Sequence, residues 1–280
     1  MQETYKNRIV DEMQLRGLSP DTIECYSSCL KLFMNQFKGR RPSQLNLQDI
    51  KNYHRKLRLR GQSNRYINMQ MSSIRFFFRN NVKNYKIDLN QIPYLPETRK
   101  LPFVLGREEV KQIINSCTNV KHRAMMIFLY ATGVRINELI NVKISDIDGR
   151  EGTIFISTGK GAKQRHVTLS PKLREELRSY YQQVKHNSVW LFPGNDGNRI
   201  SRADYVSVIF RAAKNKCGIK CPGSGHLMRH GFASHSLENG VDLRTLQMLL
   251  GHESIETTCI YLHVSKKHIS QVKSPLDGLL

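Results

Sequence analysis

Apolar residues recur at helical spacing through the first hundred residues, and this pattern predicts four helices. The second has the clearest start, with Ser19 as its N-cap and Pro20 at its first position, and Gly39 is expected to close it. Helices over 47–59 and 64–81 follow. The apolar stripe of the last helix consists of Ile67, Met71, Ile74 and Phe78. The first part of the chain is therefore predicted to be a helical bundle.

The rest of the chain mixes helices with strands. The apolar run over 124–131 predicts a helix that Gly133 stops. Residues 153–157 and 166–169 are typical of strands, and the glycine-flanked segment 159–163 between them is typical of a hairpin turn. Further helices are expected at about 172–185, 202–216, 226–238, 243–250 and 255–262.

Prolines indicate where one domain ends and the next begins. Three prolines between Ile92 and Pro102 disfavour a helix and favour an extended connector. We therefore expect a fold that is mainly α with a small β-sheet. It would consist of a helical bundle over 1–97, a mixed α/β domain over 98–264 and a tail over 265–280.

The chain is strongly basic, with a formal net charge of +21. Between Asp49 and Asp88 it carries ten basic residues and no acidic one. Because a solvated helix normally mixes signs, this stretch indicates a polyanionic partner. Nucleic acid is favoured over an anionic membrane because the helices carry core-type apolar faces. An ordinary bundle with a solvated basic face is the alternative. The candidate DNA contacts are Lys51, Arg55, Lys56, Arg58, Arg65, Arg75 and Arg79.

The sequence gives no sign of a membrane or of secretion. No apolar run reaches the length of a membrane span, and the N-terminus lacks the apolar core of a signal peptide. We expect a soluble, cytoplasmic protein that associates with the nucleoid through DNA.

The last fifth of the chain carries a set of residues suited to phosphate chemistry. His226 and Arg229 are three apart in a predicted helix, His252 follows Gly251, and Tyr261 lies nine residues beyond His252. A guanidinium binds two phosphate oxygens at once, an imidazole moves a proton near neutral pH, and a tyrosine oxygen can act as a covalent nucleophile. The alternative is a basic helix with a partly buried histidine and a core tyrosine.

Two upstream residues extend this set. Arg135 stands between apolar runs and needs an anionic partner, and Glu138, one turn on, is placed to orient it. A purely structural Arg135–Glu138 pair is equally compatible with the sequence. Lys160 sits in the glycine-flanked hairpin, where it either approaches a DNA backbone or points into solvent. Cys217, Cys221 and His226 are spaced somewhat like metal ligands, but no fourth ligand lies at a usual spacing, so no metal is expected.

Five stretches of the chain resemble, in order and spacing, the motifs of the tyrosine recombinase (phage integrase) family. They are Ala-Thr-Gly-Val-Arg-Ile-Asn-Glu-Leu, Gly-Lys-Gly-Ala-Lys-Gln-Arg, His-Leu-Met-Arg-His-Gly-Phe-Ala-Ser-His, Leu-Leu-Gly-His and Thr-Thr-Cys-Ile-Tyr. The resemblance covers roughly residues 103–264, and the basic bundle before it is similar to the family's core-binding domain. It implies a mixed α/β catalytic domain behind a DNA-binding bundle.

The resemblance also implies a reaction and a role for each residue. Tyr261 would attack the scissile phosphate and form a 3′-phosphotyrosyl link, with no metal, cofactor or ATP. Arg135 and Arg229 would hold the non-bridging oxygens. Lys160 would be the general acid toward the leaving 5′ oxygen, a role for which Lys163 competes. The two histidines remain: His226 would assist proton transfer, and His252 would donate a hydrogen bond to the phosphate.

Members of this family act as homo-tetramers on paired recombination sites in double-stranded DNA. The chain is therefore expected to be a monomer or weak oligomer when free, and its tail over 265–280 either contacts a neighbouring protomer or is disordered. The predicted function is site-specific recombination or integration, as in a mobile genetic element. A non-catalytic DNA-binding protein of the same fold and an enzyme like a type IB topoisomerase are the alternatives.

Overall fold

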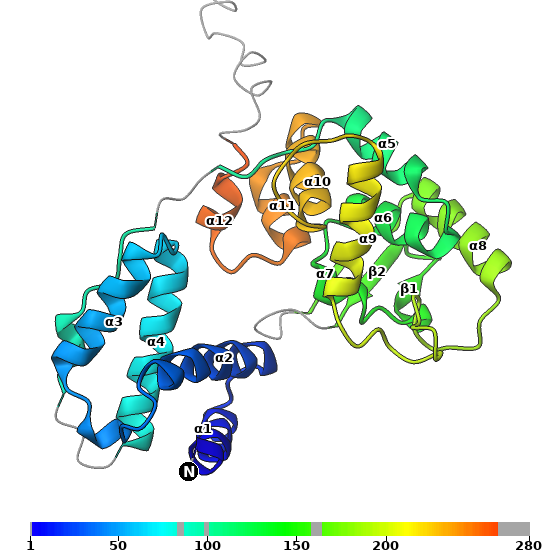
Figure 1. Ribbon diagram of the computed structural model, residues 1–280. Helices are drawn as coiled ribbons and strands as arrows, with labels where there is room; N and C mark the ends of the chain where they lie inside the picture. Colours follow the sequence, from blue (N-terminus) through cyan, green and yellow to red (C-terminus); the bar gives the residue numbers. More distant parts are fainter. Residues whose placement is uncertain (1, 83–86, 98–100, 158–163, 263–280) are drawn as a thin grey trace, which may run out of the picture. The chain divides into compact units, whose positions relative to one another are not determined.

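A computed structural model describes residues 2–82, 87–97, 101–157 and 164–262 of the chain (Figure 1). The chain divides into two compact units, one over Met1–Arg99 and the other over Lys100–Leu280. Each unit has its own hydrophobic core. In the described part of the chain, no helix is long and apolar enough to cross a membrane.

The described part of the first unit contains four α-helices, as the sequence predicts. Ser19 caps the second of them, because its side chain accepts a hydrogen bond from the backbone N–H of Thr22. That helix ends before Gly39, which lies in the following turn with a φ of +86°. The helices are α1 (Gln2–Leu15), α2 (Pro20–Gln36), α3 (Leu47–Leu59) and α4 (Asn64–Asn81), with short 3-10 turns at Pro42–Gln44 and Leu89–Gln91.

The core of the first unit is built around α4. Its predicted apolar stripe, Ile67, Met71, Ile74 and Phe78, is buried. Phe78 packs edge-on against Phe33 of α2, with ring centroids 6.2 Å apart. The prediction of an apolar face on this helix is therefore confirmed.

The second unit is mainly helical and contains one small sheet. Its strands are antiparallel in the order β1-β2-β3, with Ile154 opposite Val167. The two-residue strand β1 is too short for a sequence pattern to reveal, and so is α7. The elements are α5 (Arg107–Ser116), α6 (Val120–Thr132), α7 (Ile136–Leu139), a 3-10 turn at Ile144–Asp146, β1 (Ile147–Asp148), β2 (Thr153–Ile156), β3 (Arg165–Thr168), α8 (Pro171–Val184), α9 (Asp204–Lys216), α10 (His226–Glu238), α11 (Leu243–Leu250) and α12 (Ile255–Cys259).

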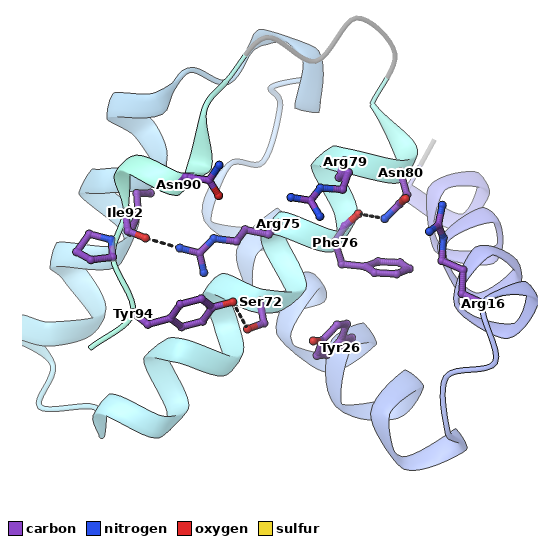
Figure 2. A pocket seen from close by; sticks show the side chains of 11 residues that line it. Arg16, Tyr26, Ser72, Arg75, Phe76, Arg79, Asn80, Asn90, Ile92 and Tyr94 are labelled. Carbon is purple, nitrogen blue, oxygen red and sulfur yellow. Dashed lines mark hydrogen bonds between the residues drawn. The ribbon is translucent and has the colours of Figure 1, made fainter. Parts of the chain in front are cut away.

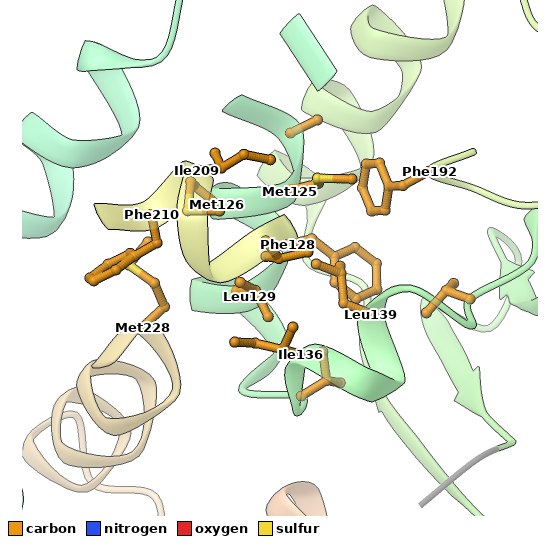
Figure 3. Packing of buried hydrophobic residues seen from close by; sticks show 14 of the residues in the cluster. Met125, Met126, Phe128, Leu129, Ile136, Leu139, Phe192, Ile209, Phe210 and Met228 are labelled. Atoms are coloured by element: carbon orange, nitrogen blue, oxygen red, sulfur yellow. The ribbon is translucent and has the colours of Figure 1, made fainter. Parts of the chain in front are cut away.

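Helix α6 runs through the core of this unit. Figure 3 shows its side chains Met125 and Phe128 among those of neighbouring elements, including Phe192. Gly133 ends the helix in the left-handed region, with φ +64°, and a Cβ there would lie 2.2 Å from the ring of Phe232. Only glycine therefore fits this stop, which turns the chain into the segment that carries Arg135.

Helices α10 and α11 and the turn after α12 form a smaller, separate cluster of apolar side chains. The predicted helix over 255–262 is shorter than expected, because α12 ends at Cys259. The backbone N–H of Tyr261 donates to the carbonyl of Thr258, three residues back, which is a turn geometry and not that of an α-helix. The cluster consists of Ala233, Leu237, Leu246, Leu250 and Tyr261.

Candidate active site

Two arginines share one buried carboxylate in the second unit. Nη1 of Arg135, the N-cap of α7, donates to Oε1 of Glu138 at 2.9 Å, and the backbone N–H of Arg135 donates to Oε2 at 2.7 Å. Arg165, which begins β3, donates to both carboxylate oxygens, at 3.0 and 2.7 Å. Burial raises the pKa of Glu138, but the hydrogen bonds and charge of Arg165, and then those of Arg135, leave it below its ordinary value.

These bonds connect α7, β3 and the end of α11. Nε of Arg165 donates to the carbonyl of Leu249 at 2.7 Å, and Nη2 of Arg135 donates to the carbonyl of Gly251 at 3.1 Å. Gly251 ends α11 with a φ of +63°, and a Cβ there would lie 2.9 Å from Nη1 of Arg165. Glycine at this position therefore lets the turn that carries His252 lie directly against the arginine.

Arg229 projects from the first turn of α10 and is 5% exposed. Its Nη1 donates to the carbonyl of Gly133 at 2.7 Å, and its Nη2 donates to the carbonyl of Leu250 at 2.8 Å. The same Nη2 lies 2.8 Å from Nε2 of His252. Burial, and then the charge of Arg135, lowers the pKa of Arg229 to about 10.

His252 is held at both ring nitrogens. Because a guanidinium can only donate, Nε2 of His252 accepts from Arg229, and the ring hydrogen is then on Nδ1. Nδ1 donates to Oγ1 of Thr258 at 2.9 Å. Burial, and then the charges of Arg229 and Arg135, lowers the pKa of His252 to about 3. The imidazole is therefore neutral, and both of its nitrogens are used within the protein.

Tyr261 is 1% exposed and lies beside these cations. Its hydroxyl is 2.9 Å from Nδ1 of His230, and the two ring centroids are 5.7 Å apart. Burial raises the pKa of Tyr261, while the charges of Arg229 and Arg135 oppose that rise. The tyrosine is consequently a protonated phenol at neutral pH, close enough to both guanidinium groups to be affected by their charge.

The other predicted catalytic residues are His226, which lies within reach of the charges of this cluster, and a lysine outside the described residues. His226 is the first residue of α10 and is partly exposed to solvent, yet burial, and then the charges of Arg229 and Arg135, lowers its pKa. Lys160 and its competitor Lys163 fall outside the described residues, as does the tail over 265–280. The structure thus brings Arg135, Arg229, His252 and Tyr261 together, all within the second unit.

The basic residues predicted to contact DNA belong to α3 and α4. Four of them are exposed: Arg55, Arg58, Arg65 and Arg79. The others have less freedom: Lys51 is half-buried, and Nζ of Lys56 donates to Gln36 at 2.6 Å. The guanidinium of Arg75 is engaged within the protein.

Arg75 is bound within its own unit. Its Nη2 donates to the carbonyl of Ile92, and its guanidinium lies 4.2 Å from the ring centroid of Tyr94. It lines a cavity of about 490 Å³ that also holds Arg16 and Arg79 (Figure 2). The described lining of this cavity includes no carboxylate, so its charge is positive.

Family comparisons agree with this arrangement. Residues 104–268 match the phage integrase family, and residues 6–87 match the phage integrase N-terminal SAM-like domain. The chain belongs to the phage integrase family of tyrosine recombinases. This recombinase is 34% identical to a putative integrase/recombinase of Sinorhizobium fredii, over 98% of this chain and 89% of that protein. It is 32% identical to the tyrosine recombinase XerA of Pyrococcus furiosus, over 96% of this chain and 94% of that protein.

The fold of the recombinase also matches a solved structure. A crystal structure of a lambda integrase tetramer bound to a Holliday junction aligns with a TM-score of 0.74 over 90% of this chain and 77% of that chain. The sequence identity is 17%, so this likeness concerns the fold. The predicted family and the predicted fold class, mainly α with a small sheet, are both confirmed.

Sequence reasoning missed two residues that contact the recombinase's site. His230 is one position from Arg229, but its partner Tyr261 lies 31 residues away, and no local pattern links them. Arg165 is the last residue of the motif Gly-Lys-Gly-Ala-Lys-Gln-Arg, in which only the lysines were considered as catalytic candidates. An arginine at the start of a half-buried strand is nevertheless a signal for a buried anion. That anion is Glu138, 27 residues away in the sequence.

Proposed function

We propose that this recombinase cuts and rejoins DNA at specific sites through a covalent bond between Tyr261 and a 3′ phosphate. The observation that carries the proposal is an uncompensated positive charge beside a tyrosine. Arg135, Arg165 and Arg229 interact with one carboxylate, Glu138, among the described residues, which leaves a balance of 3 − 1, or +2. Two positive charges suit a phosphodiester that gains negative charge in its pentavalent transition state.

In the proposed step, Oη of Tyr261 forms a bond to phosphorus while the bond from phosphorus to the 5′ oxygen breaks. The phenolic proton leaves the tyrosine with help from His226, and the 5′ oxygen takes a proton from Lys160. Arg135 and Arg229 bind the non-bridging oxygens. Because the phosphotyrosyl bond conserves the energy of the phosphodiester, a 5′-hydroxyl from another strand reverses the step without ATP, metal or cofactor.

His252 has a more specific requirement. In the DNA-free protein its Nε2 accepts a hydrogen bond from Arg229, so it has no hydrogen to donate to a phosphate. We propose that the incoming phosphate takes over the Arg229 donor and that Nε2 then binds a proton. A bound anion favours that proton, because it offsets the guanidinium charge that lowers the pKa of His252.

The proposed partner is double-stranded DNA carrying paired sites, bound by four copies of the chain. One tyrosine cuts one strand, and exchange between two duplexes involves four strands. The shared fold with a lambda integrase tetramer on a Holliday junction supports this assembly. We assign the candidate DNA contacts on α3 and α4 to the duplex backbone, and we place the protein at the nucleoid in the cytoplasm.

Covalent capture on a nicked duplex tests the proposal. Sites are first enriched from genomic fragments by their covalent attachment to the protein, and are then rebuilt as suicide duplexes that prevent rejoining. The unaltered protein is expected to form an adduct that Tyr261→Phe abolishes. Tyr130→Phe is the matched control, because the Tyr130 hydroxyl is also 2.9 Å from a histidine Nδ1, that of His235. No adduct from the unaltered protein would support the non-catalytic DNA-binding alternative.

Two-site DNA separates a recombinase from a topoisomerase. The proposal expects recombinant product from a plasmid that carries two copies of the site. Relaxation of supercoils with no recombinant at any protein concentration would favour the topoisomerase-like alternative.

The assignment of the general acid is tested with a modified leaving group. Lys160→Ala is expected to block cleavage of ordinary DNA. The same variant is expected to cleave DNA normally when the 5′ bridging oxygen is replaced by sulfur, because a thiolate leaves without a proton. Lys163→Ala is the matched variant, because Lys163 is the competing candidate in the same glycine-flanked stretch of sequence. If Lys163→Ala, and not Lys160→Ala, were rescued by sulfur, the acid would be Lys163.

A further inference from the structure

The hydroxyl of Tyr261 is hydrogen-bonded to a histidine that has no role in the proposed reaction. Helix α10 carries Arg229, whose guanidinium is assigned to the phosphate, and His230 directly after it. Nδ1 of His230 is 2.9 Å from the hydroxyl of Tyr261. Among the described residues, His230 is the hydrogen-bond partner of that hydroxyl. A buried phenol needs such a partner, so the bond fixes where the oxygen points.

We propose that His230 positions the nucleophile: its Nδ1 accepts the hydroxyl hydrogen of Tyr261 and so directs the oxygen lone pairs toward the phosphate held by Arg229. The inference rests on the proposed function, since it assumes that Tyr261 attacks. A hydroxyl that donates to His230 keeps both of its lone pairs available for phosphorus. Because Arg229 and His230 are neighbours on one helix, α10 then fixes the phosphate and the attacking oxygen relative to each other.

Positioning explains the contact better than proton removal does. Burial, and then the charges of His226 and Arg229, lowers the pKa of His230 to about 4. A base of that strength would take a proton from a buried phenol only with difficulty, whereas a neutral imidazole is a good hydrogen-bond acceptor. The distinction has a chemical test, because an asparagine amide occupies nearly the place of Nδ1 but cannot accept a proton at neutral pH.

The experiment measures single-turnover adduct formation on the suicide duplex at saturating DNA. His230→Ala is expected to lower the first-order cleavage rate roughly 10-fold to 100-fold, in line with the loss of one orienting hydrogen bond. His230→Asn is expected to restore the rate to within about 5-fold of the unaltered protein, because the bond is remade. His230→Gln, whose amide lies one carbon farther out, is expected to behave like His230→Ala. DNA affinity is expected to stay the same in all three.

His235→Ala is the matched control for a purely structural effect. It removes a histidine Nδ1 that binds the partly buried hydroxyl of Tyr130, from the same helix and at the same 2.9 Å distance. Its cleavage rate is expected to stay within about 3-fold of normal, because Tyr130 takes no part in the reaction. An equal loss in His235→Ala and His230→Ala would overturn the proposal in favour of general damage to α10.

Three other results would also overturn it. A rate in His230→Asn as low as in His230→Ala would make His230 a proton acceptor. A faster rate in His230→Ala would make the bond a restraint that holds Tyr261 away from DNA. An unchanged rate would leave His230 without a role. No adduct from the unaltered protein would instead refute the proposed function itself, so the two failures are distinguishable.

Discussion

The arginine side and the tyrosine side of the candidate site are held in different ways. On the arginine side, Glu138 accepts four hydrogen bonds from two arginines, and Arg229 is fixed by two carbonyls and a histidine. On the tyrosine side, Tyr261 belongs to a small apolar cluster, and one hydrogen bond to His230 is recorded for its hydroxyl.

The difference follows from what each side does. Guanidinium groups that bind a developing charge act best when they are already in place, because no reorganisation is then needed during the reaction. A nucleophile must form and break a bond, so a single exchangeable hydrogen bond suits it. The comparison predicts that changes on the arginine side cost both stability and rate, whereas changes at His230 cost mainly rate.

The largest expected effect is on stability, at the carboxylate of the arginine side. Glu138→Gln removes the negative charge that pairs with Arg165. Both side chains are buried: that of Arg165 is 8% exposed and that of Glu138 is 1% exposed. We expect a loss of about 3–5 kcal/mol in the free energy of unfolding, because a buried arginine is left without its anion. Urea denaturation measures it. The control is Glu175→Gln, which removes an exposed partner of Lys172 and should change stability little. A loss below about 1 kcal/mol in Glu138→Gln would contradict the account.

Next in size is the effect of Arg229→Lys on cleavage. A lysine ammonium cannot reproduce the planar set of hydrogen bonds that a guanidinium makes to two backbone carbonyls and a phosphate. The burial that lowers the pKa of Arg229 would also favour the neutral amine of a lysine at this position. We expect the single-turnover rate to fall by roughly 10²–10³. Arg107→Lys, at an exposed arginine that also contacts α10, is the control. A fall of less than about 5-fold in Arg229→Lys would mean that its charge alone suffices.

The smallest effect expected is a change in the pH dependence of stability. The pKa of His252 is about 3 in the folded protein, below that of an exposed histidine. As the pH falls from about 6.5 toward that value, the unfolded chain binds a proton that the folded chain does not, so stability falls. His252→Asn is expected to make this decline shallower, by at most about 1.4 kcal/mol per pH unit. Urea midpoints between pH 7.5 and 4.5 measure it, with the exposed His166→Asn as control. Equal slopes in the two variants would refute it.

Local signals in the sequence predicted much of the fold. Ser19, the repeated apolar positions of α4 and the stop at Gly133 each act over a few residues, so their outcome is visible in the sequence. The four-residue α7 and the two-residue β1 were missed because neither is long enough to show a period.

Motif spacing could predict most residues of the candidate site but not the contacts between them. Motif spacing identified Arg135, Arg229, His252 and Tyr261, and the structure brings them together. The contacts between them were not predictable, because they join positions that are far apart in the sequence. The hydrogen bond between Arg229 and His252 depends on how α10 and α11 pack. The hydrogen bond between His230 and Tyr261 depends on the turn after α12.

The most direct test of the central claim is to identify the amino acid that carries the DNA. The adduct formed on a suicide duplex is digested with nuclease and trypsin and analysed by tandem mass spectrometry. Trypsin releases residues 245–266, in which Tyr261 is the single tyrosine. The account predicts a 3′-phosphonucleotide on Tyr261 of that peptide. A nucleotide on any other residue, or a 5′-phosphate linkage, would contradict it.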